Sequence, residues 1–352
     1  MRKKGLIRVL VAEDSAVVQE YLLYLLAEDP ALEVVGTARD GLEAVERAER
    51  LKPDVILMDV HMPRLNGYEA TRQIMERTPA PIVMISASIA PDEVAMTFAA
   101  LEAGALTVLE KPLGPDHPRQ AETARKLLET LRLMAEVKVV RRWPRRERLA
   151  LAPEPLARPD RKVRVVAIGA STGGPPVVAE ILRGLPPDLG APILLVQHIA
   201  HGFTTGLAEW LGQGTRLAVK LATANEPALP GAVHVAPEGV QMGITAQGRI
   251  RLASEPGEDG FRPSASYLFR SVAEAYGRSA LGVLLTGMGR DGAAGLLRLR
   301  QAGGTTIAQN EETSAVFGMP REAIRLGAAE YVLSPEQISG VVRSLAEHRT
   351  GE

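Results

Sequence analysis

Cysteine is absent from all 352 positions of the chain. Its absence excludes disulfide bonds, thiolate metal sites and a catalytic thiol. No excess of one charge is present either: the formal net charge is −1 at pH 7, so no nucleic-acid partner is expected. Long apolar runs are also lacking. The run at residues 6–12 meets Glu13 and Asp14 at once, unlike a signal peptide, and glycine, proline and histidine interrupt residues 189–208. We therefore expect a cytoplasmic protein that is not embedded in a membrane.

The length and composition of the chain indicate two globular domains. Hydrophobic residues make up 46 % and charged residues 24 % of the sequence, which is enough apolar material for two cores. Between residues 138 and 162 arginine and proline dominate and no apolar period is sustained, which is typical of a linker. We predict a first domain over residues 5–122, a helical and then Pro- and Arg-rich linker over 123–161, and a second domain over 162–350. Trp143 is the one linker residue expected to dock on a domain.

Both halves alternate short apolar strands with amphipathic helices, which predicts two doubly wound parallel sheets in an α/β fold. In the second half we also expect a hairpin formed by residues 241–245 and 249–253. The predicted strands of the two halves are 6–12, 33–38, 55–58, 82–85 and 106–109, and then 163–168, 193–197, 217–221, 233–236, 281–285, 305–308 and 330–333.

Polar side chains follow the predicted strands of the first half. They are Glu13, Asp14, Asp59, Ser86 and Lys111. Because the carboxyl ends of parallel strands share one edge of the sheet, we expect these groups to lie together. Three neighbouring carboxylates would repel one another without a hard divalent cation, and Mg²⁺ suits such a partly hydrated site. Taken singly, each residue is better explained as a loop cap or a solvated charge, but all five together favour a phosphoryl-accepting site.

The motifs VLVAEDS, LMDVHMPRLNG, ISAS and EKP make this half similar to the receiver domain of two-component response regulators. The resemblance implies that Asp59 is the phosphoacceptor and that Ser86 and Lys111 are switch residues. It also implies a Mg²⁺ site formed by Glu13, Asp14, Asp59 and the backbone carbonyl of His61.

The second half opens with a strand, a glycine turn and a helix, VRVVAIGASTGGPP, which place Ser171 beside a helix N-terminus. This geometry serves either phosphate binding or a nucleophile elbow, here Gly169-x-Ser171-x-Gly173. A dinucleotide site needs an acid at the end of the next strand, but that strand ends in Gln197 and His198. No G-K-[ST] motif is present either, so the sequence favours a nucleophile.

A nucleophilic serine needs a base, and the base needs a carboxylate to orient it. His198 follows the strand that we expect beside the Ser171 strand, and Asp291 lies in the glycine-rich loop after residues 281–285. Each residue has an ordinary structural explanation: a helix cap, a buried histidine and a turn aspartate. On successive strand ends they predict a triad, whose order Ser, His, Asp differs from that of the α/β-hydrolases.

The motifs GASTGG, VQHI, GFT, HVAP, LFRSVA, LLTGMGRDGA and VFGMPREAI, behind a receiver and a linker, make the chain resemble the chemotaxis methylesterase CheB family over nearly its whole length. The resemblance implies a Rossmann-like catalytic domain with Ser171, His198 and Asp291 as its triad. It further implies that Thr172 supports the imidazole and that the backbone N–H of Met288 helps to form the oxyanion hole.

The activity implied by the resemblance is hydrolysis of glutamyl methyl esters on methyl-accepting chemotaxis receptors, with glutamine deamidation as a second reaction and no cofactor for the esterase step. The receiver would inhibit the active site until a chemotaxis sensor histidine kinase phosphorylates Asp59. Ala200, Ser266 and Asn310 depart from the residues usual in the family. Two alternatives are an output domain that binds a nucleotide and one that serves only for docking.

Overall fold

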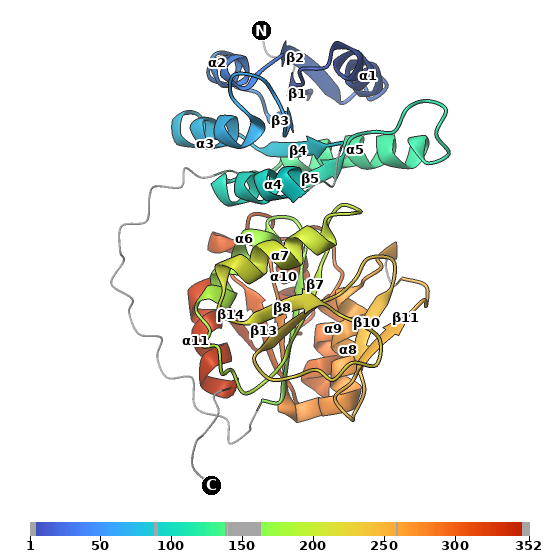
Figure 1. Cartoon of the computed structure of the whole chain (residues 1–352), viewed down its shortest axis with the longest axis vertical. Coiled ribbons are helices and arrows are strands. Elements are labelled where there is room, and N and C mark those ends of the chain that lie inside the picture. The colour runs from blue at the N-terminus through green and yellow to red at the C-terminus, as the bar shows by residue number, and fades with distance from the viewer. Residues whose placement is uncertain (1–4, 88–90, 138, 140–162, 258–259, 347–352) are drawn as a thin grey trace. The chain divides into compact units, whose positions relative to one another are not determined.

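The structure is a computed structural model that describes residues 5–87, 91–137, 139, 163–257 and 260–346. The chain divides into two compact units, with the division at residues 148 and 149 (Figure 1). Residues 140–162 lie outside the described part, and with them the predicted docking of Trp143.

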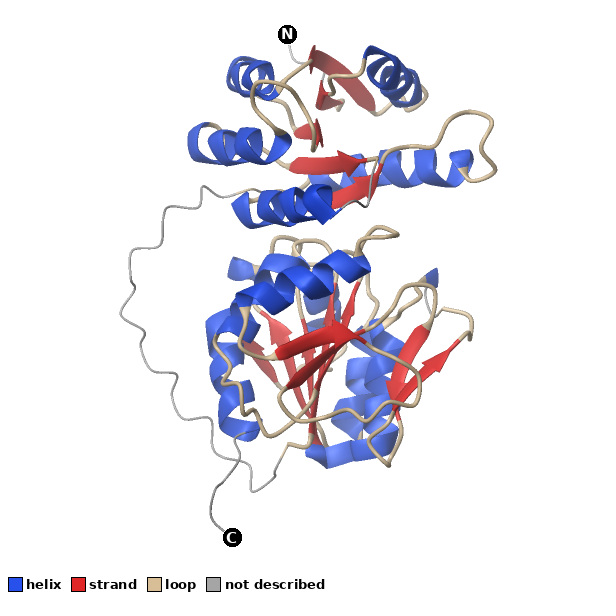
Figure 2. Cartoon of the chain, viewed as in Figure 1, coloured by secondary structure: helices blue, strands red, loops and turns tan. Residues whose placement is uncertain are grey.

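The first unit is built on a five-stranded parallel sheet of order β2-β1-β3-β4-β5. Strands β3 and β4 are buried along their whole length, because helices cover both faces of the sheet (Figure 2). Helices α1 and α5 contact each other in one layer, and α2, α3 and α4 form the other. The elements are β1 (Ile7–Ala12), α1 (Ala16–Ala27), β2 (Leu32–Ala38), α2 (Gly41–Leu51), β3 (Val55–Asp59), α3 (Gly67–Arg77), β4 (Ile82–Ser86), α4 (Pro91–Ala103), β5 (Thr107–Glu110) and α5 (Gln120–Ala135).

Helix α5 belongs to the first unit, because it buries a stripe of apolar side chains at helical spacing. The stripe consists of Ala124, Leu127, Leu131 and Met134, and the helix contacts β3, β4 and α1. The boundary that we predict at residue 122 therefore falls within α5.

The second unit contains a seven-stranded parallel sheet of order β14-β13-β12-β6-β7-β9-β8, and β10 and β11 form a separate antiparallel hairpin. Helix α6 contacts α7 and α11 in one layer, and α9 contacts α8 and α10 in another. The elements are β6 (Val165–Ala170), α6 (Gly174–Arg183), β7 (Ile193–Gln197), α7 (Thr204–Gly214), β8 (Ala218–Leu221), β9 (Ala232–Val235), β10 (Gln241–Ile244), β11 (Ile250–Ala253), α8 (Ala265–Tyr276), β12 (Ala280–Leu284), α9 (Ala293–Gln301), β13 (Thr305–Gln309), α10 (Met319–Arg325), β14 (Tyr331–Leu333) and α11 (Pro335–Ala346), with short 3₁₀ turns η2 (Gly277–Ser279) and η3 (Glu311–Thr313).

The order of strands in the second sheet reverses at β6. From β6 the chain adds β7 and then β9 and β8 on one side, and it later returns to add β12, β13 and β14 on the other. In open α/β sheets the crevice beyond the strand ends at such a reversal is the usual ligand site. The loops after β6, β7 and β12 meet at this edge, and they carry the three residues of the predicted triad.

The structure confirms the predicted fold class, two doubly wound parallel sheets, and the hairpin. Small differences occur at element ends. Helix α10 begins at Met319 rather than at 321, because Pro320 fits within the first helical turn. No helix among the described residues is both long and apolar enough to cross a membrane.

Candidate active site and acidic site

Ser171 occupies a tight turn between β6 and α6. Its backbone N–H donates to the carbonyl of Thr286 at 3.0 Å, and its own carbonyl accepts from the N–H of Gly174 at 2.8 Å. The turn requires glycine at 173: φ is +73°, and a Cβ there would lie 2.5 Å from the Cβ of Ala315. The predicted strand–turn–helix geometry around Ser171 is therefore present.

His198 stands beside Ser171 because β7 is the direct neighbour of β6. Ala170 and Gln197 are paired in register, so Ser171 and His198 are the first residues beyond two adjacent strands. The backbone N–H of His198 donates to the carbonyl of Ala170 at 2.9 Å. The buried side-chain amide of Gln197 then donates to two carbonyls at once, that of Ser171 at 2.7 Å and that of His198 at 2.9 Å. This one amide therefore fixes the backbone at both Ser171 and His198.

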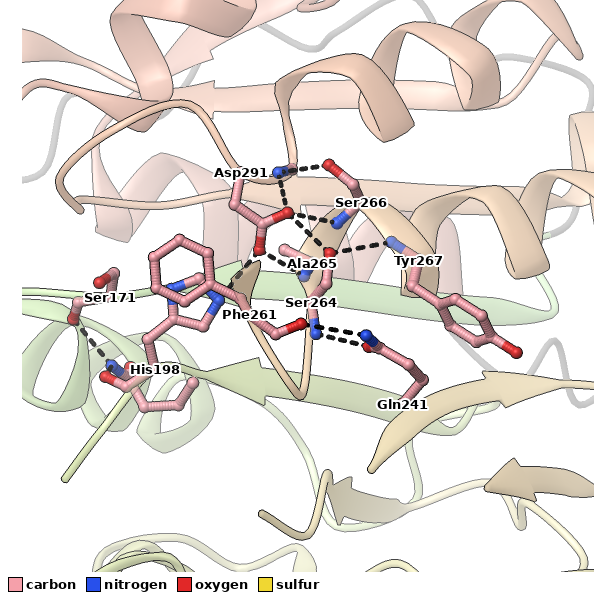
Figure 3. A network of polar contacts seen from close by, with 11 residues as sticks. Ser171, His198, Gln241, Phe261, Ser264, Ala265, Ser266, Tyr267 and Asp291 are labelled. Atoms are coloured by element: carbon pink, nitrogen blue, oxygen red, sulfur yellow. Dashed lines mark hydrogen bonds and ion pairs between the residues drawn. The ribbon is translucent and has the colours of Figure 1, made fainter. Parts of the chain in front are cut away.

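Asp291 is brought to His198 from the far side of β6. Its Oδ2 lies 2.9 Å from Nε2 of His198 (Figure 3). The carboxylate also accepts the hydroxyl of Ser264 at 2.8 Å, and its remaining donors are the backbone N–H groups of Ala265 at 2.7 Å, Ser266 at 3.0 Å and Gly292 at 2.8 Å. Three of these four residues form the N-terminus of α8, where the helix dipole favours negative charge.

The Asp291 carboxylate is ionised, although its side chain has no exposed surface. Burial raises the pKa of Asp291, but the contact with His198 and the hydrogen bonds from Ser264 and Ala265 outweigh it and lower the pKa to about 2. A fixed negative charge therefore lies against one nitrogen of the imidazole.

The imidazole of His198 is held between charged and aromatic neighbours. The ring of Phe261 stacks on it, with centroids 4.2 Å apart and an angle of 1° between the planes. Nδ1 is buried and has no hydrogen bond within the described part of the chain. Figure 3 shows Ser171 on the side of the imidazole away from Asp291. Nδ1 is therefore the ring nitrogen available to the serine.

The other two predicted residues of this site lie next to Ser171 in the fold. The carbonyl of Thr172 accepts from Oγ1 of Thr286 at 3.0 Å, which fixes the turn. Gly287 runs directly against Ser171: a Cβ at 287 would lie 2.6 Å from the Cβ of Ser171. Met288 follows immediately. The roles of Thr172 beside the imidazole and of the Met288 N–H toward an oxyanion stay predictions.

In the first unit the structure gathers the predicted acidic residues. Carboxylate oxygens of Glu13, Asp14 and Asp59 all lie within 4.8 Å of one another. Nζ of Lys111 lies 2.9 Å from Glu13 and 3.0 Å from Asp59. Burial, helped by the charge of Glu13, raises the pKa of Asp59 to about 7. Such close oxygen donors, with more negative charge than one lysine balances, fit Mg²⁺.

Ser86 and His61 share a partner that the sequence did not suggest. The hydroxyl of Ser86 donates to Glu93 of α4 at 2.7 Å, and Nε2 of His61 lies 3.5 Å from the same carboxylate. The backbone N–H of Lys111 donates to the carbonyl of Ser86 at 2.8 Å, which links the two predicted switch residues. The carbonyl of His61 stays a predicted ligand.

Known families match both halves of the chain. The family described as CheB methylesterase matches residues 166–342, and the response regulator receiver domain matches residues 9–131. A protein-glutamate methylesterase/protein-glutamine glutaminase of Geobacter metallireducens is 50% identical over 344 residues, covering 97% of this chain and 99% of the relative. A relative of the same name in Nitrosospira multiformis is 49% identical over 98% of each chain. The crystal structure of the Thermotoga maritima CheB methylesterase catalytic domain is 39% identical, with a TM-score of 0.51, and covers 52% of this chain and 98% of that domain.

The chain belongs to the CheB methylesterase family. Its membership confirms the family identified from the sequence motifs and the esterase class of enzyme, preceded by a receiver domain. Membership of this family favours a methylesterase regulated by its receiver domain over an output domain that binds a nucleotide or serves only for docking.

Several residues of this CheB site were not predicted from the sequence. Gln197, Ser264 and Phe261 all contact the predicted triad in the structure. Ser264 had a signal, since it directly precedes an amphipathic helix and caps α8. Phe261 and the side chain of Gln197 had none, because only the tertiary fold brings them to His198.

Proposed function

We propose that this chain is a protein-glutamate methylesterase that hydrolyses glutamyl methyl esters on the cytoplasmic part of methyl-accepting chemotaxis receptors, and that it also deamidates glutamine. The observation that carries the proposal is the alignment of Asp291, His198 and Ser171 at the reversal point of the sheet. The 2.9 Å contact between Asp291 and Nε2 of His198 leaves Nδ1 for the serine. The names of relatives that are about half identical over nearly the whole chain support the substrate class.

In the proposed reaction Nδ1 of His198 accepts the proton of the Ser171 hydroxyl as its oxygen attacks the ester carbonyl. Asp291 stabilises the imidazolium that forms. His198 returns the proton to the leaving methoxide, and methanol departs. Water then attacks the acyl-enzyme with His198 as the base, which releases the glutamate carboxylate and restores Ser171. With a glutamine side chain the same steps release ammonia, and neither reaction requires a cofactor.

The backbone next to Ser171 supplies the proposed oxyanion site. The loop at Gly287 presses against Ser171, and the carbonyl of Gly287 accepts from the N–H groups of Gly318 at 3.1 Å and Met319 at 2.9 Å, so its position is fixed. The N–H of Met288 follows this anchored point and is our candidate donor. Thr172 is the candidate that supports the imidazole. Loss of one such donor costs about 10²–10³ in kcat in other hydrolases.

Control of the esterase is assigned to the receiver domain. A chemotaxis sensor histidine kinase would phosphorylate Asp59, and Glu13, Asp14, Asp59 and the carbonyl of His61 would hold Mg²⁺. When bound, the ion neutralises charge around the phosphoryl group. Lys111 would bind a phosphoryl oxygen, and Ser86 would exchange its bond to Glu93 for one to the phosphoryl group. The unphosphorylated receiver would inhibit the active site. The proposal also places the protein in the cytoplasm, where the kinase and the substrate part of the receptors lie.

The decisive measurement is methanol release from methylated receptor by purified full-length protein. We expect Ser171→Ala and His198→Ala to lower turnover by about 10⁴–10⁶. His201→Ala is the matched control, because His201 is three residues away but its side chain is 71 % exposed, and it should keep the normal rate. A Ser171→Ala protein with near-normal turnover would remove the assignment.

The regulatory part is tested with a small-molecule phosphodonor and Mg²⁺. The unaltered protein should gain activity, and Asp59→Asn should not respond while keeping its basal rate. Removal of residues 1–138 should raise the basal rate, and a fragment no more active than the unphosphorylated chain would contradict inhibition by the receiver.

A further inference from the structure

The segment from Phe261 to Ser264 contacts both members of the proposed charge pair. At one end the ring of Phe261 lies flat on the imidazole of His198. At the other end the hydroxyl of Ser264 donates to Asp291 at 2.8 Å. Only two residues separate these ends, so the position of this segment sets the imidazole and the carboxylate together.

Gln241 fastens both ends of this segment. Its side-chain Nε2 donates to the carbonyl of Phe261 at 3.0 Å, and its Oε1 accepts from the backbone N–H of Ser264 at 2.8 Å (Figure 3). The residue has no exposed surface, so water cannot replace these bonds. Gln241 begins the hairpin β10–β11, which packs on α8. The fold thereby connects a hairpin outside the main sheet to the edge where Ser171 lies.

The stack limits how the imidazole can turn. The last torsion of a histidine side chain is broad, so the ring needs neighbours to fix its plane. Asp291 holds one edge of the ring through Nε2, but a single contact leaves rotation about that contact free. A parallel aromatic face removes that rotation, and it also accommodates the positive charge that the imidazole carries during acyl transfer.

We propose that Phe261 and Gln241 are positioning residues for His198: Gln241 fixes the 261–264 segment, and Phe261 holds the imidazole in the plane where Nδ1 meets the Ser171 hydroxyl. This inference rests on the proposed function and extends it to residues outside the triad. Small errors in the position of a catalytic group cost large factors in rate, because reactive geometries are narrow. The ring therefore acts on kcat, through His198, and not on the binding of the receptor.

The test compares variants of the full-length protein, activated by a phosphodonor, in methanol release. Phe261 is 39 % exposed, so its replacement leaves the fold intact. We expect Phe261→Leu to lower kcat about tenfold with KM within twofold, and Phe261→Tyr, which keeps the ring, to stay within twofold in both. Gln241→Met, similar in size but unable to form either hydrogen bond, should lower kcat by a similar factor. The double variant should be no slower than the slower single variant, because both act on the same ring.

The matched control is Ser271→Ala. Its hydroxyl also joins the hairpin to α8, accepting from the N–H of Ile244 at 2.8 Å and donating to its carbonyl at 3.0 Å, but at the other end of β10. It should keep kcat within twofold, which separates positioning from general loosening of the hairpin. The rate at which a fluorophosphonate labels Ser171 gives a second readout without receptor, and it should fall about tenfold in Phe261→Leu and Gln241→Met.

The outcomes are distinct. A rise in KM with normal kcat and normal labelling in Phe261→Leu would make Phe261 a substrate contact and overturn the proposal. Normal kcat and KM would also overturn it, and so would an equal loss in Ser271→Ala. If Gln241→Met fails to fold, Phe261→Leu and Phe261→Tyr still decide. Ser171→Ala, measured in parallel, separates failure of the proposed function from failure of this inference. If Ser171→Ala stays active, the proposed function fails. If Ser171→Ala is inactive while Phe261→Leu is normal, only the positioning role of Phe261 and Gln241 fails.

Discussion

Replacing Asp291 with asparagine tests the electrostatics of the site, because the change keeps the shape and removes the charge. Oδ2 lies 2.9 Å from Nε2 of His198 and accepts from the N–H of Ala265, whereas Oδ1 accepts from Ser264, Ser266 and Gly292. An asparagine must place its NH₂ group at one of these positions. The position of Oδ2 loses fewer bonds, so the amide would turn its N–H groups toward His198. The imidazole would then present the wrong nitrogen protonated, and kcat should fall by about 10³–10⁴.

The same substitution has a cost in stability with a defined dependence on pH. The pKa of Asp291 falls from 3.8 to about 2 on folding, which corresponds to about 2 kcal/mol. Because the folded-state pKa is below the unfolded value, this stabilisation is complete above pH 4 and is lost as the pH falls toward 2. Asparagine does not titrate. The free energy of unfolding of Asp291→Asn should therefore be about 2 kcal/mol lower at pH 6–7 and approach that of the unaltered protein near pH 2.

Trp210 of α7 can report unfolding of the second unit alone. The chain has two tryptophans, and a Trp143→Phe background leaves only this one. Urea unfolding followed by its fluorescence between pH 2.5 and 7 would measure the difference. Asp188→Asn, at an exposed aspartate of the same unit, is the control and should change nothing. A stability difference that is the same at every pH would refute the charge argument, and a loss of less than tenfold in kcat would refute the role in orienting His198.

Three further substitutions probe the second unit, two of them next to Ser171. Gln197→Met removes both hydrogen bonds that the amide donates. It should lower kcat for methanol release about 10–100-fold and the free energy of unfolding in urea by about 1–2 kcal/mol. An unchanged kcat would contradict the proposal that Gln197 holds Ser171 and His198 in place. Gly173→Ala should lower the free energy of unfolding by about 1–3 kcal/mol and remove most of the activity. Gly239→Ala is the control: φ is similar at +77°, but nothing lies within 4 Å of the added Cβ, so it should lower the free energy of unfolding by only about 1 kcal/mol. Equal losses in the two variants would show that the clash with Ala315 is unimportant. Burial raises the pKa of Glu226, but hydrogen bonds from Lys220 and neighbouring groups outweigh it and lower the pKa to about 2. Glu226→Gln should therefore lower the free energy of unfolding by about 1–2 kcal/mol at neutral pH, and this loss should vanish as the pH falls from 4.5 to 2. A loss that is the same at every pH would argue against a stabilising ion pair between Glu226 and Lys220.

The sequence carried enough information to predict both sheets and the edge at which each site lies. Continuous apolar strands followed by polar residues identify strand ends, and short connections make consecutive strands neighbours. That rule alone placed His198 beside Ser171, because β7 directly follows β6 in the chain and in the sheet. The shared edge of parallel strand ends brought Glu13 and Asp59 together in the same way: Glu13 follows β1, and Asp59 is the last residue of β3, which pairs with β1.

Side chains that support the site from other elements could not be predicted in this way. Glu93, Gln241 and Phe261 follow no strand of the main sheets and belong to no motif that specifies chemistry. Their partners are 7 to 63 residues away in the chain, and the contacts depend on how a helix start or a hairpin packs. The same limit applied to Gln197: its position at a strand end was visible, but its two carbonyl partners were not.

Convergence of strand ends does not by itself explain the contact between His198 and Asp291. Strands β7 and β12 lie on opposite sides of β6, so their ends are about 9–10 Å apart at the usual strand spacing. The side chains of His198 and Asp291 span part of this distance to make the 2.9 Å contact, and the loop after β12 spans the rest by crossing the end of β6, where Gly287 runs against Ser171. The glycines of TGMGRDGAAG make the crossing possible: a Cβ at 287 would strike Ser171, and Gly289 and Gly292 have φ of +80° and +86°. The loop then fixes its carboxylate on the N-terminus of α8. The glycine-rich sequence around Asp291 thus allows that residue to reach His198 across the end of the strand that leads to Ser171.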